Sequence, residues 1–128
     1  RGVDVRVIVP GEFTDVPFVR QASRFYYTHL LRRGIRVFEY QPTMMHAKTM
    51  VVDGAWTTIG SSNFDDRSFR LNDEVNVNIY DESIATQMEQ MFFEDLARSE
   101  EITRRRWLRR PAFDRVKERI AEWFKPQL

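Results

Sequence analysis

The chain has 128 residues, a formal net charge of +1 and a hydrophobic share of 42%. This size and composition predict one folded domain with its own core and exclude an intrinsically disordered chain. The absence of cysteine excludes disulfides, thiolate metal sites and a cysteine nucleophile. The net charge hides an asymmetry, because residues 1–97 carry a balance of −4 and residues 98–128 a balance of +5. The basic end indicates an acidic or anionic partner, although charge alone favours a solvated helix face.

Two strands and one helix are predicted in the first 40 residues. Residues 5–9 form a β-branched run before Pro10-Gly11, which indicates a buried strand followed by a loop. Apolar residues recur at helical spacing over 18–31, and Gly34 lies where a helix-ending glycine is expected. The alternating segment 35–40 predicts the second strand.

The middle of the chain predicts a hairpin and a further strand. Residues 48–52 and 56–59 are separated by Asp53-Gly54, a strong signal for a two-residue turn. The polar stretch 60–70 predicts a loop. Residues 74–80 alternate strictly, and this pattern predicts a strand with Val75, Val77 and Ile79 on one face.

Two helices are predicted in the last third. The first runs over 84–99 after a cap at Asp81 or Ser83, and its expected buried face comprises Ile84, Met88, Met91 or Phe92, and Leu96. After the basic stretch 104–110, Pro111 can open a second helix ending near Phe124. The element order predicts an α/β fold, with a mixed β-sheet flanked by helices on both faces, in a single domain over 1–128.

Chemically versatile side chains gather around the predicted hairpin. His46 and Lys48 are two residues apart in an extended segment, so they project from the same face. The turn at Asp53 returns the chain, and brings Ser61 and Asn63 back beside His46. A lysine together with hydroxyl and amide donors suits the oxygens of a phosphate.

Glu74 begins the next strand, and its carboxylate can orient one imidazole nitrogen of His46 and raise the basicity of the other. A histidine held in this way is a candidate phosphorus nucleophile or general acid. The sequence has no carboxylate cluster with metal-ligand spacing, so we expect a mechanism without a metal or other cofactor. Taken singly, each residue has a simpler structural interpretation, and for Asp53 the turn itself is sufficient; only the joint pattern indicates a site.

The joint pattern resembles the phospholipase D superfamily, whose signature is H-x-K-x(4)-D-x(6)-G-S-x-N. The fixed positions are met at the same spacing by His46, Lys48, Asp53, Gly60, Ser61 and Asn63. Residues 1–10, 33–40 and 109–128 are similar to the second catalytic domain of bacterial cardiolipin synthases. The resemblance covers most of the chain and implies the half-domain fold of this superfamily.

The resemblance also implies a mechanism in which two motifs build one site. One histidine forms a phosphohistidine, and the other protonates the leaving alcohol. Lys48, Ser61 and Asn63 are then expected to bind the phosphate. The expected catalytic residues are His46, Lys48, Asp53 and Glu74. Only one motif is present, so we expect a fragment that pairs with a second HxK-containing domain of the same chain, or with a homodimer mate. His46 would be the acid/base in a C-terminal half, and would have either role in a homodimer.

Three functions are compatible with these residues. The first is cardiolipin synthase-like transfer between phosphatidylglycerol molecules, with the arginines of 104–110 facing an anionic membrane surface. It implies a location at the bacterial cytoplasmic membrane through segments outside this chain, with this domain itself soluble. The second is a phosphodiesterase or nuclease acting on nucleic acid. The third is a half domain that is inactive until it pairs.

Overall fold

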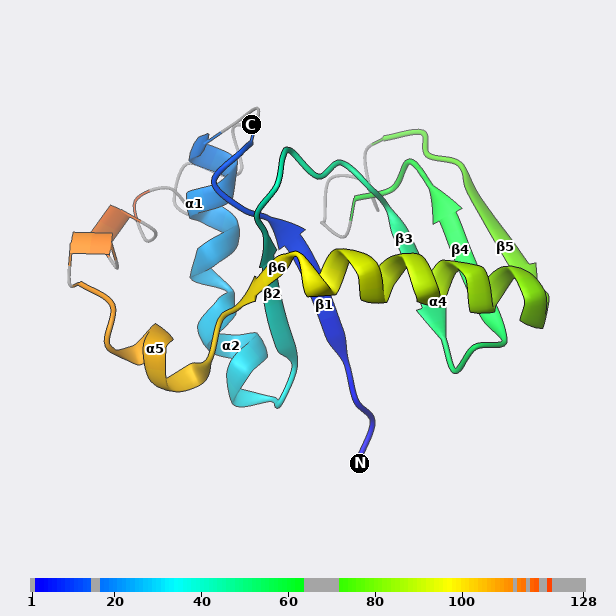
Figure 1. The fold of residues 1–128 in the computed structure, drawn as a ribbon. Coiled ribbons are helices and arrows are strands. Elements are labelled where there is room, and N and C mark those ends of the chain that lie inside the picture. Colours follow the sequence, from blue (N-terminus) through cyan, green and yellow to red (C-terminus); the bar gives the residue numbers. More distant parts are fainter. Residues whose placement is uncertain are drawn as a thin grey trace. The chain divides into compact units, whose positions relative to one another are not determined.

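The computed structural model describes residues 2–14, 17–63, 72–111, 113, 114, 116, 117 and 120. The chain divides into two compact units. Unit 1 consists of Arg1–Met45 and Arg98–Leu128, and unit 2 consists of His46–Ala97. The α/β fold class is confirmed, and the described strands form two three-stranded sheets (Figure 1). A single domain over 1–128 stays a prediction.

The sheet of unit 1 is mixed, as expected. Strand β1 (Arg6–Pro10) runs parallel to β2 (Arg36–Tyr40), and β2 pairs antiparallel with β6 (Ser99–Glu101). The sequence did not predict β6, because its three residues have no alternating pattern and follow directly on a helix. They become a strand through pairing with β2, with Phe38 opposite Glu101.

The first predicted helix is interrupted in the structure. It consists of α1 (Pro17–Phe25) and α2 (Tyr27–Arg32), and at the junction the Tyr26 N–H donates to the Ser23 carbonyl, three residues back. Gly34 ends α2 with a φ of +81°, a conformation that glycine adopts readily. The expected glycine stop is therefore confirmed, and the single continuous helix is wrong.

The core of unit 1 lies between β2, α2 and α5 (Arg104–Leu108). Its buried members are Tyr27, Val37, Ile102 and Trp107. The rings of Tyr27 and Trp107 are 5.0 Å apart, and Trp107 Nε1 donates to Thr28 Oγ1 over 2.9 Å. Residues 113, 114, 116, 117 and 120 are also helical, in agreement with the helix predicted after Pro111; residues 121–128 lie outside the described part.

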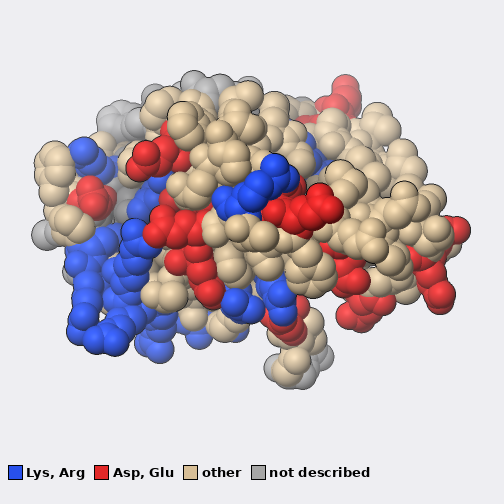
Figure 2. Space-filling view, viewed as in Figure 1, with Lys and Arg blue, Asp and Glu red and all other residues tan. Residues whose placement is uncertain are grey.

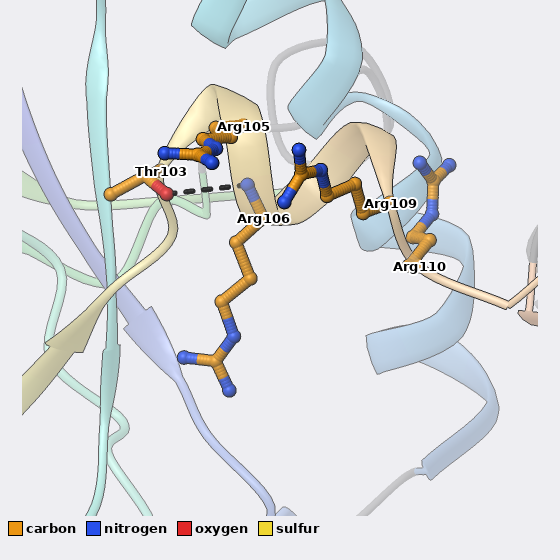
Figure 3. Close-up of a pocket in the computed structure, with 5 residues that line it drawn as sticks. All are labelled: Thr103, Arg105, Arg106, Arg109 and Arg110. Carbon is orange, nitrogen blue, oxygen red and sulfur yellow. Dashed lines mark hydrogen bonds between the residues drawn. The ribbon is translucent and has the colours of Figure 1, made fainter.

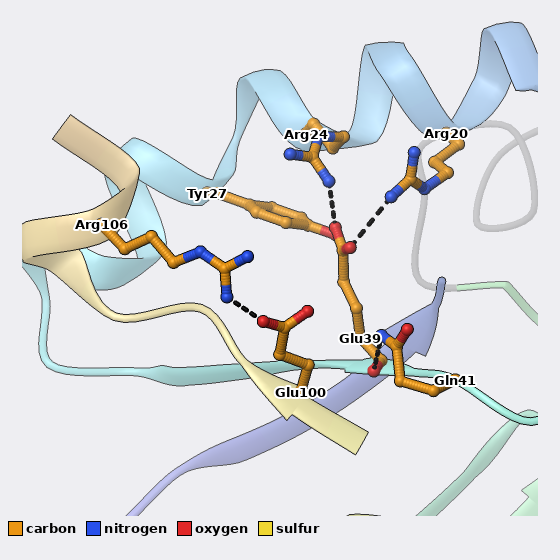
Figure 4. A network of polar contacts seen from close by, with 7 residues as sticks. All are labelled: Arg20, Arg24, Tyr27, Glu39, Gln41, Glu100 and Arg106. Carbon is orange, nitrogen blue, oxygen red and sulfur yellow. Dashed lines mark hydrogen bonds and ion pairs between the residues drawn. The ribbon is translucent and has the colours of Figure 1, made fainter. Parts of the chain in front are cut away.

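A carboxylate is also buried in unit 1 (Figure 4). The Glu39 side chain on β2 is only 6% exposed and accepts from Arg20 Nη2 at 2.9 Å, from Arg24 Nη1 and from the Tyr27 hydroxyl at 3.2 Å. Burial raises the pKa of the Tyr27 phenol far above its ordinary value, and the neighbouring Glu39 charge raises it further. The alternation of 35–40 gave no signal for this network.

Unit 2 contains an antiparallel sheet of three consecutive strands, β3 (Thr49–Val52), β4 (Trp56–Gly60) and β5 (Asn76–Tyr80). Asp53 and Gly54 connect the first two with φ angles of +51° and +60°. Two successive positive φ angles are typical of the tight hairpin turn that the Asp-Gly pair predicts. The predicted hairpin is therefore confirmed.

Helix α4 (Glu82–Ala97) packs against all three strands of this sheet. Asp81 Oδ1 accepts from the Ile84 N–H at 2.9 Å, which confirms the predicted cap. Ala85 is fully buried, as is Thr57 on β4. The inward face is centred on Ala85, and Met88, Phe92 and Leu96 of the predicted face are half-buried. Ile84 was also predicted to be buried, but it is exposed.

The outer part of this unit differs from the expected pattern in one further respect. Val75 and Val77, which were predicted to lie on the apolar face of a strand over residues 74–80, are 73% and 55% exposed. The Ile79 side chain, on the same predicted face, is half-buried. Within the described residues, no helix combines the length and the apolar character needed to cross a bilayer.

Candidate active site

The predicted site residues all lie in unit 2, and most of them lie at one end of the β3–β4 hairpin. His46 and Lys48 come directly before β3, where His46 is exposed and Lys48 is half-buried. The Gly60 N–H donates to the Lys48 carbonyl over 3.1 Å, which continues the pairing of β3 and β4 by one step. The backbones of the HxK and GSxN segments therefore lie side by side.

Gly60 is required by the close approach of a third strand. A Cβ atom at this position would overlap the Val75 carbonyl oxygen and the Asn76 side chain. Gly60 faces Asn76 in the β4–β5 register, so the absence of a side chain lets β5 reach the end of β4. The glycine of the motif is thus a packing requirement at the site.

Ser61 joins the end of β4 to the start of β5. Its N–H donates to the Val75 carbonyl, and its hydroxyl oxygen accepts from the Val75 N–H, both over 3.0 Å. Its hydroxyl donates to Glu74 Oε2. Because a serine hydroxyl has a single proton, Ser61 cannot donate to Glu74 and to a phosphate at the same time. The predicted phosphate contact of Ser61 would require this hydrogen bond to break.

The Glu74 carboxylate accepts hydrogen bonds from residues other than His46, its predicted partner. Besides Ser61, Asn72 Nδ2 donates to Glu74 Oε1 over 3.4 Å. In the part of the chain that the structure describes, His46 makes no hydrogen bond. Orientation of His46 by Glu74 therefore stays a prediction, and the observed carboxylate fixes the serine of the motif.

Asp53 and Asn63 lie at different places relative to this cluster. Asp53 is in the turn, at the opposite end of β3 from Lys48 and roughly 15 Å away along the strand. This placement supports its role in the turn and keeps it away from the histidine end. Asn63 is exposed and follows Ser61 by two residues, at the histidine end.

A further polar contact was not predicted. Asn76 Nδ2 donates to Ser62 Oγ over 2.6 Å, so a second serine also binds the start of β5. This pair follows from the register of β4 against β5, in which Gly60 lies opposite Asn76. Only a prediction of that register could have located the pair from the sequence. No three His, Cys, Asp or Glu side chains among the described residues gather as metal ligands would.

Comparison with known proteins identifies the family of this motif. Residues 1–96 match the family described as "Cardiolipin synthase, PLD-like domain". The chain belongs to this phospholipase D-like family. It is 41% identical to cardiolipin synthase A of Proteus mirabilis over 128 residues, and 41% identical to a cardiolipin synthase of Staphylococcus aureus over 127 residues. These alignments cover 100% and 99% of the chain but 26% of each relative, so the chain spans about a quarter of their length.

A solved structure agrees with the phospholipase D-like fold. The chain is similar to Nuc from Salmonella typhimurium, a phospholipase D family member, with a TM-score of 0.64 and 18% sequence identity. The similarity covers 80% of this chain and 66% of that one. At this identity the match concerns the fold alone, and it confirms the phospholipase D-like fold that the resemblance implies.

Proposed function

We propose that the chain supplies one half of a phospholipase D-type active site that transfers a phosphatidyl group between two phosphatidylglycerol molecules. The 41% identity to proteins named cardiolipin synthase, over the whole chain, supports this substrate class. The other half would come from a second HxK-containing domain or from a second copy of the chain, because this sequence contains one motif only.

The observation that carries the proposal is the hydrogen bond from the Gly60 N–H to the Lys48 carbonyl. It sets the HxK segment beside the segment that contains Asn63. Lys48 would then neutralise the phosphate, and the Asn63 amide would bind a phosphoryl oxygen as charge develops. Ser61 and Glu74 would hold the ends of β4 and β5 in place around this group.

The proposed reaction has two steps and uses two histidines, of which His46 is one. In the first, a bond forms between phosphorus and the nucleophilic imidazole, while the bond from phosphorus to the leaving glycerol oxygen breaks. The other histidine gives that oxygen a proton. In the second step, a hydroxyl of another phosphatidylglycerol gives its proton to the other histidine. Its oxygen forms a bond to phosphorus, while the bond from phosphorus to the nucleophilic imidazole breaks. The products are cardiolipin and glycerol.

The test compares the two histidines of the chain. The chain assembled with its second half is incubated with phosphatidylglycerol, and both products are measured. Substitution of His46→Asn is expected to lower the rate by at least about 100-fold, since a positioned proton donor or nucleophile is lost. His29→Asn is the matched control, because His29 is exposed on α2 in the other unit.

Equal rates for His46→Asn and the native protein would contradict the proposed role. A folded assembly that leaves phosphatidylglycerol intact but cleaves single-stranded DNA would instead support the nuclease alternative. An acid-labile phosphatidyl group trapped on the His46 peptide would identify His46 as the nucleophile, and trapping on the other histidine would make His46 the acid/base.

A further inference from the structure

Unit 1 presents an arginine-rich surface around α5. The structure contains an open groove of about 430 Å³ whose walls are formed by Thr103, Arg105, Arg106, Arg109 and Arg110. In Figure 3 the Arg106 side chain extends away from the other three arginines. Figure 2 shows the basic side chains of this region gathered at the lower left of the view, over α5.

Part of this charge has no acidic partner among the residues that the structure describes. Arg106 forms an ion pair with Glu100 of β6. Arg104, Arg105 and Arg109 are exposed and form no ion pair in the described part of the chain. An exposed cluster of like charges with no internal partner attracts anions from outside the molecule.

The helix that carries these arginines is held firmly in place. Trp107 is 3% exposed and packs into the core of unit 1, where its indole N–H donates to Thr28. At the start of the helix, the Arg106 N–H donates to Thr103 Oγ1 over 3.4 Å. The basic face is therefore a fixed feature of the fold.

Exposed apolar side chains lie among the arginines and after them. Leu108 is 47% exposed and Phe113 is 67% exposed, and two aliphatic residues at helical spacing from Phe113 are also half exposed, namely Val116 and Ile120. Lys117 Nζ lies 4.4 Å from the centre of the Phe113 ring. Arginine and lysine beside exposed Leu, Phe, Val and Ile are typical of segments that lie in the interface of an anionic membrane.

We propose that the exposed arginines of α5 and Arg109, together with Leu108, Phe113, Val116 and Ile120, form a docking surface for an anionic phospholipid bilayer, with the arginines on the headgroups and the apolar side chains in the interface. A nucleic acid would use the same charges, but it would leave the aliphatic side chains in water, so the membrane is favoured. The proposal rests on the proposed function for its purpose, which is to hold the chain where phosphatidylglycerol lies.

The test measures binding of the 128-residue chain to vesicles by flotation. Native chain is expected to bind vesicles of phosphatidylcholine with phosphatidylglycerol, and to remain free with phosphatidylcholine alone. The double substitution Arg105→Gln and Arg109→Gln is expected to weaken binding by about 30-fold, because each basic residue near an anionic surface contributes about fivefold. An ionic strength of about 1 M, which screens charges beyond about 3 Å, should weaken native binding too.

The matched control removes the same charge elsewhere in unit 1. Arg6→Gln and Arg36→Gln break exposed ion pairs with Asp4 and Glu101. The loss of exposed ion pairs lowers the stability only slightly. This control should bind as the native chain does. Phe113→Ser, which keeps every charge, should weaken vesicle binding and leave any oligonucleotide binding unchanged.

Several results would overturn the docking surface. They are equal weakening by the two double substitutions, no effect of Phe113→Ser, or binding of single-stranded DNA without binding of anionic vesicles. The enzyme proposal is tested separately with phosphatidylglycerol dispersed in neutral detergent micelles, where docking is not needed. Turnover there without vesicle binding rejects only the docking surface, and vesicle binding without turnover rejects only the proposed reaction.

Discussion

Glu39 in unit 1 and Glu74 in unit 2 each accept more than one side-chain hydrogen bond, but their surroundings differ. Glu39 is almost completely buried, and two arginines and a tyrosine surround its carboxylate. Glu74 is half-buried and is bonded by the neutral side chains of Ser61 and Asn72.

The difference indicates how work is divided between the two units. In unit 1 the buried carboxylate and the arginines around it compensate each other's charge. Removing one partner leaves the remaining charge buried without that compensation. In unit 2 the polar groups hold strand ends together, while His46 and Lys48 remain accessible for a ligand. Substitutions of the buried charges in unit 1 should therefore act mainly on stability, and substitutions of His46 or Lys48 in unit 2 mainly on activity.

The largest effect on stability is expected from Glu39→Ala. This change removes the buried carboxylate that Arg20 and Arg24 share, and with it the acceptor of the Tyr27 hydroxyl. Breaking a buried ion pair from one side costs about 3–5 kcal/mol. Urea unfolding followed by circular dichroism should show this loss, and hydrogen exchange should accelerate first in the peptides of β2 and α5.

Glu101→Ala is the matched control for this change. Glu101 also pairs with an arginine of unit 1, Arg36, but both side chains are about 40% exposed, at 39% and 43%. The expected loss is at most about 1 kcal/mol. Similar losses for the two substitutions would show that burial of Glu39 has no special weight, and would remove the contrast between the units.

The next largest effect is expected from Gly60→Ala. The added methyl group would overlap the Val75 carbonyl and the Asn76 side chain, so β5 must shift away from β4. Overpacking of this kind costs about 1–3 kcal/mol. Because the shift also disturbs the Gly60–Lys48 hydrogen bond, cardiolipin formation by the assembled enzyme should fall together with stability.

Gly54→Ala tests whether activity follows stability alone. At Gly54 the nearest atom to an added Cβ is Glu89 Oε2, at 3.9 Å, and the positive φ makes alanine unfavourable by about 1–2 kcal/mol. This variant should lose stability and keep its turnover at a temperature where it is folded. If both glycine variants lose activity in proportion to stability, Gly60 has no separate role in shaping the site.

The sequence was most informative where local chemistry determines the structure. The Asp53-Gly54 turn, the cap at Asp81 and the stop at Gly34 all depend on backbone preferences within a few residues, and all were predicted. The motif from His46 to Asn63 identified the superfamily because its residues belong to one hairpin and the short segments beside it. The spacing between them along the sequence is therefore fixed locally.

Features that depend on distant residues could not be predicted in this way. Strand β6 exists because β2 lies beside it, and the charge of Glu39 is tolerated because Arg20 and Arg24 approach from another element. Likewise, the Ser61 hydroxyl is engaged by Glu74 through the register of β4 and β5. In each case the deciding partner lies more than ten residues away, where periodicity has no information.

The remaining prediction concerns Tyr27 and the pH dependence of the stability of unit 1. Burial and the Glu39 charge raise the pKa of the folded Tyr27 phenol, whereas in the unfolded chain the group ionises near its ordinary value of about 10. The stabilisation is therefore complete below about pH 10 and is lost as the pH rises above it, because only the unfolded chain releases the proton. At about pH 11 this group should lower the free energy of unfolding by about 1.4 kcal/mol.

Urea unfolding at several alkaline pH values should show a free energy of unfolding that falls less steeply with pH for Tyr27→Phe than for the native chain. Tyr80→Phe, at a tyrosine that is 84% exposed, should keep the native slope. Parallel slopes for the native chain and Tyr27→Phe would mean that the buried phenol is not coupled to folding, and that the polar cluster around Glu39 is open to water like the groups of unit 2.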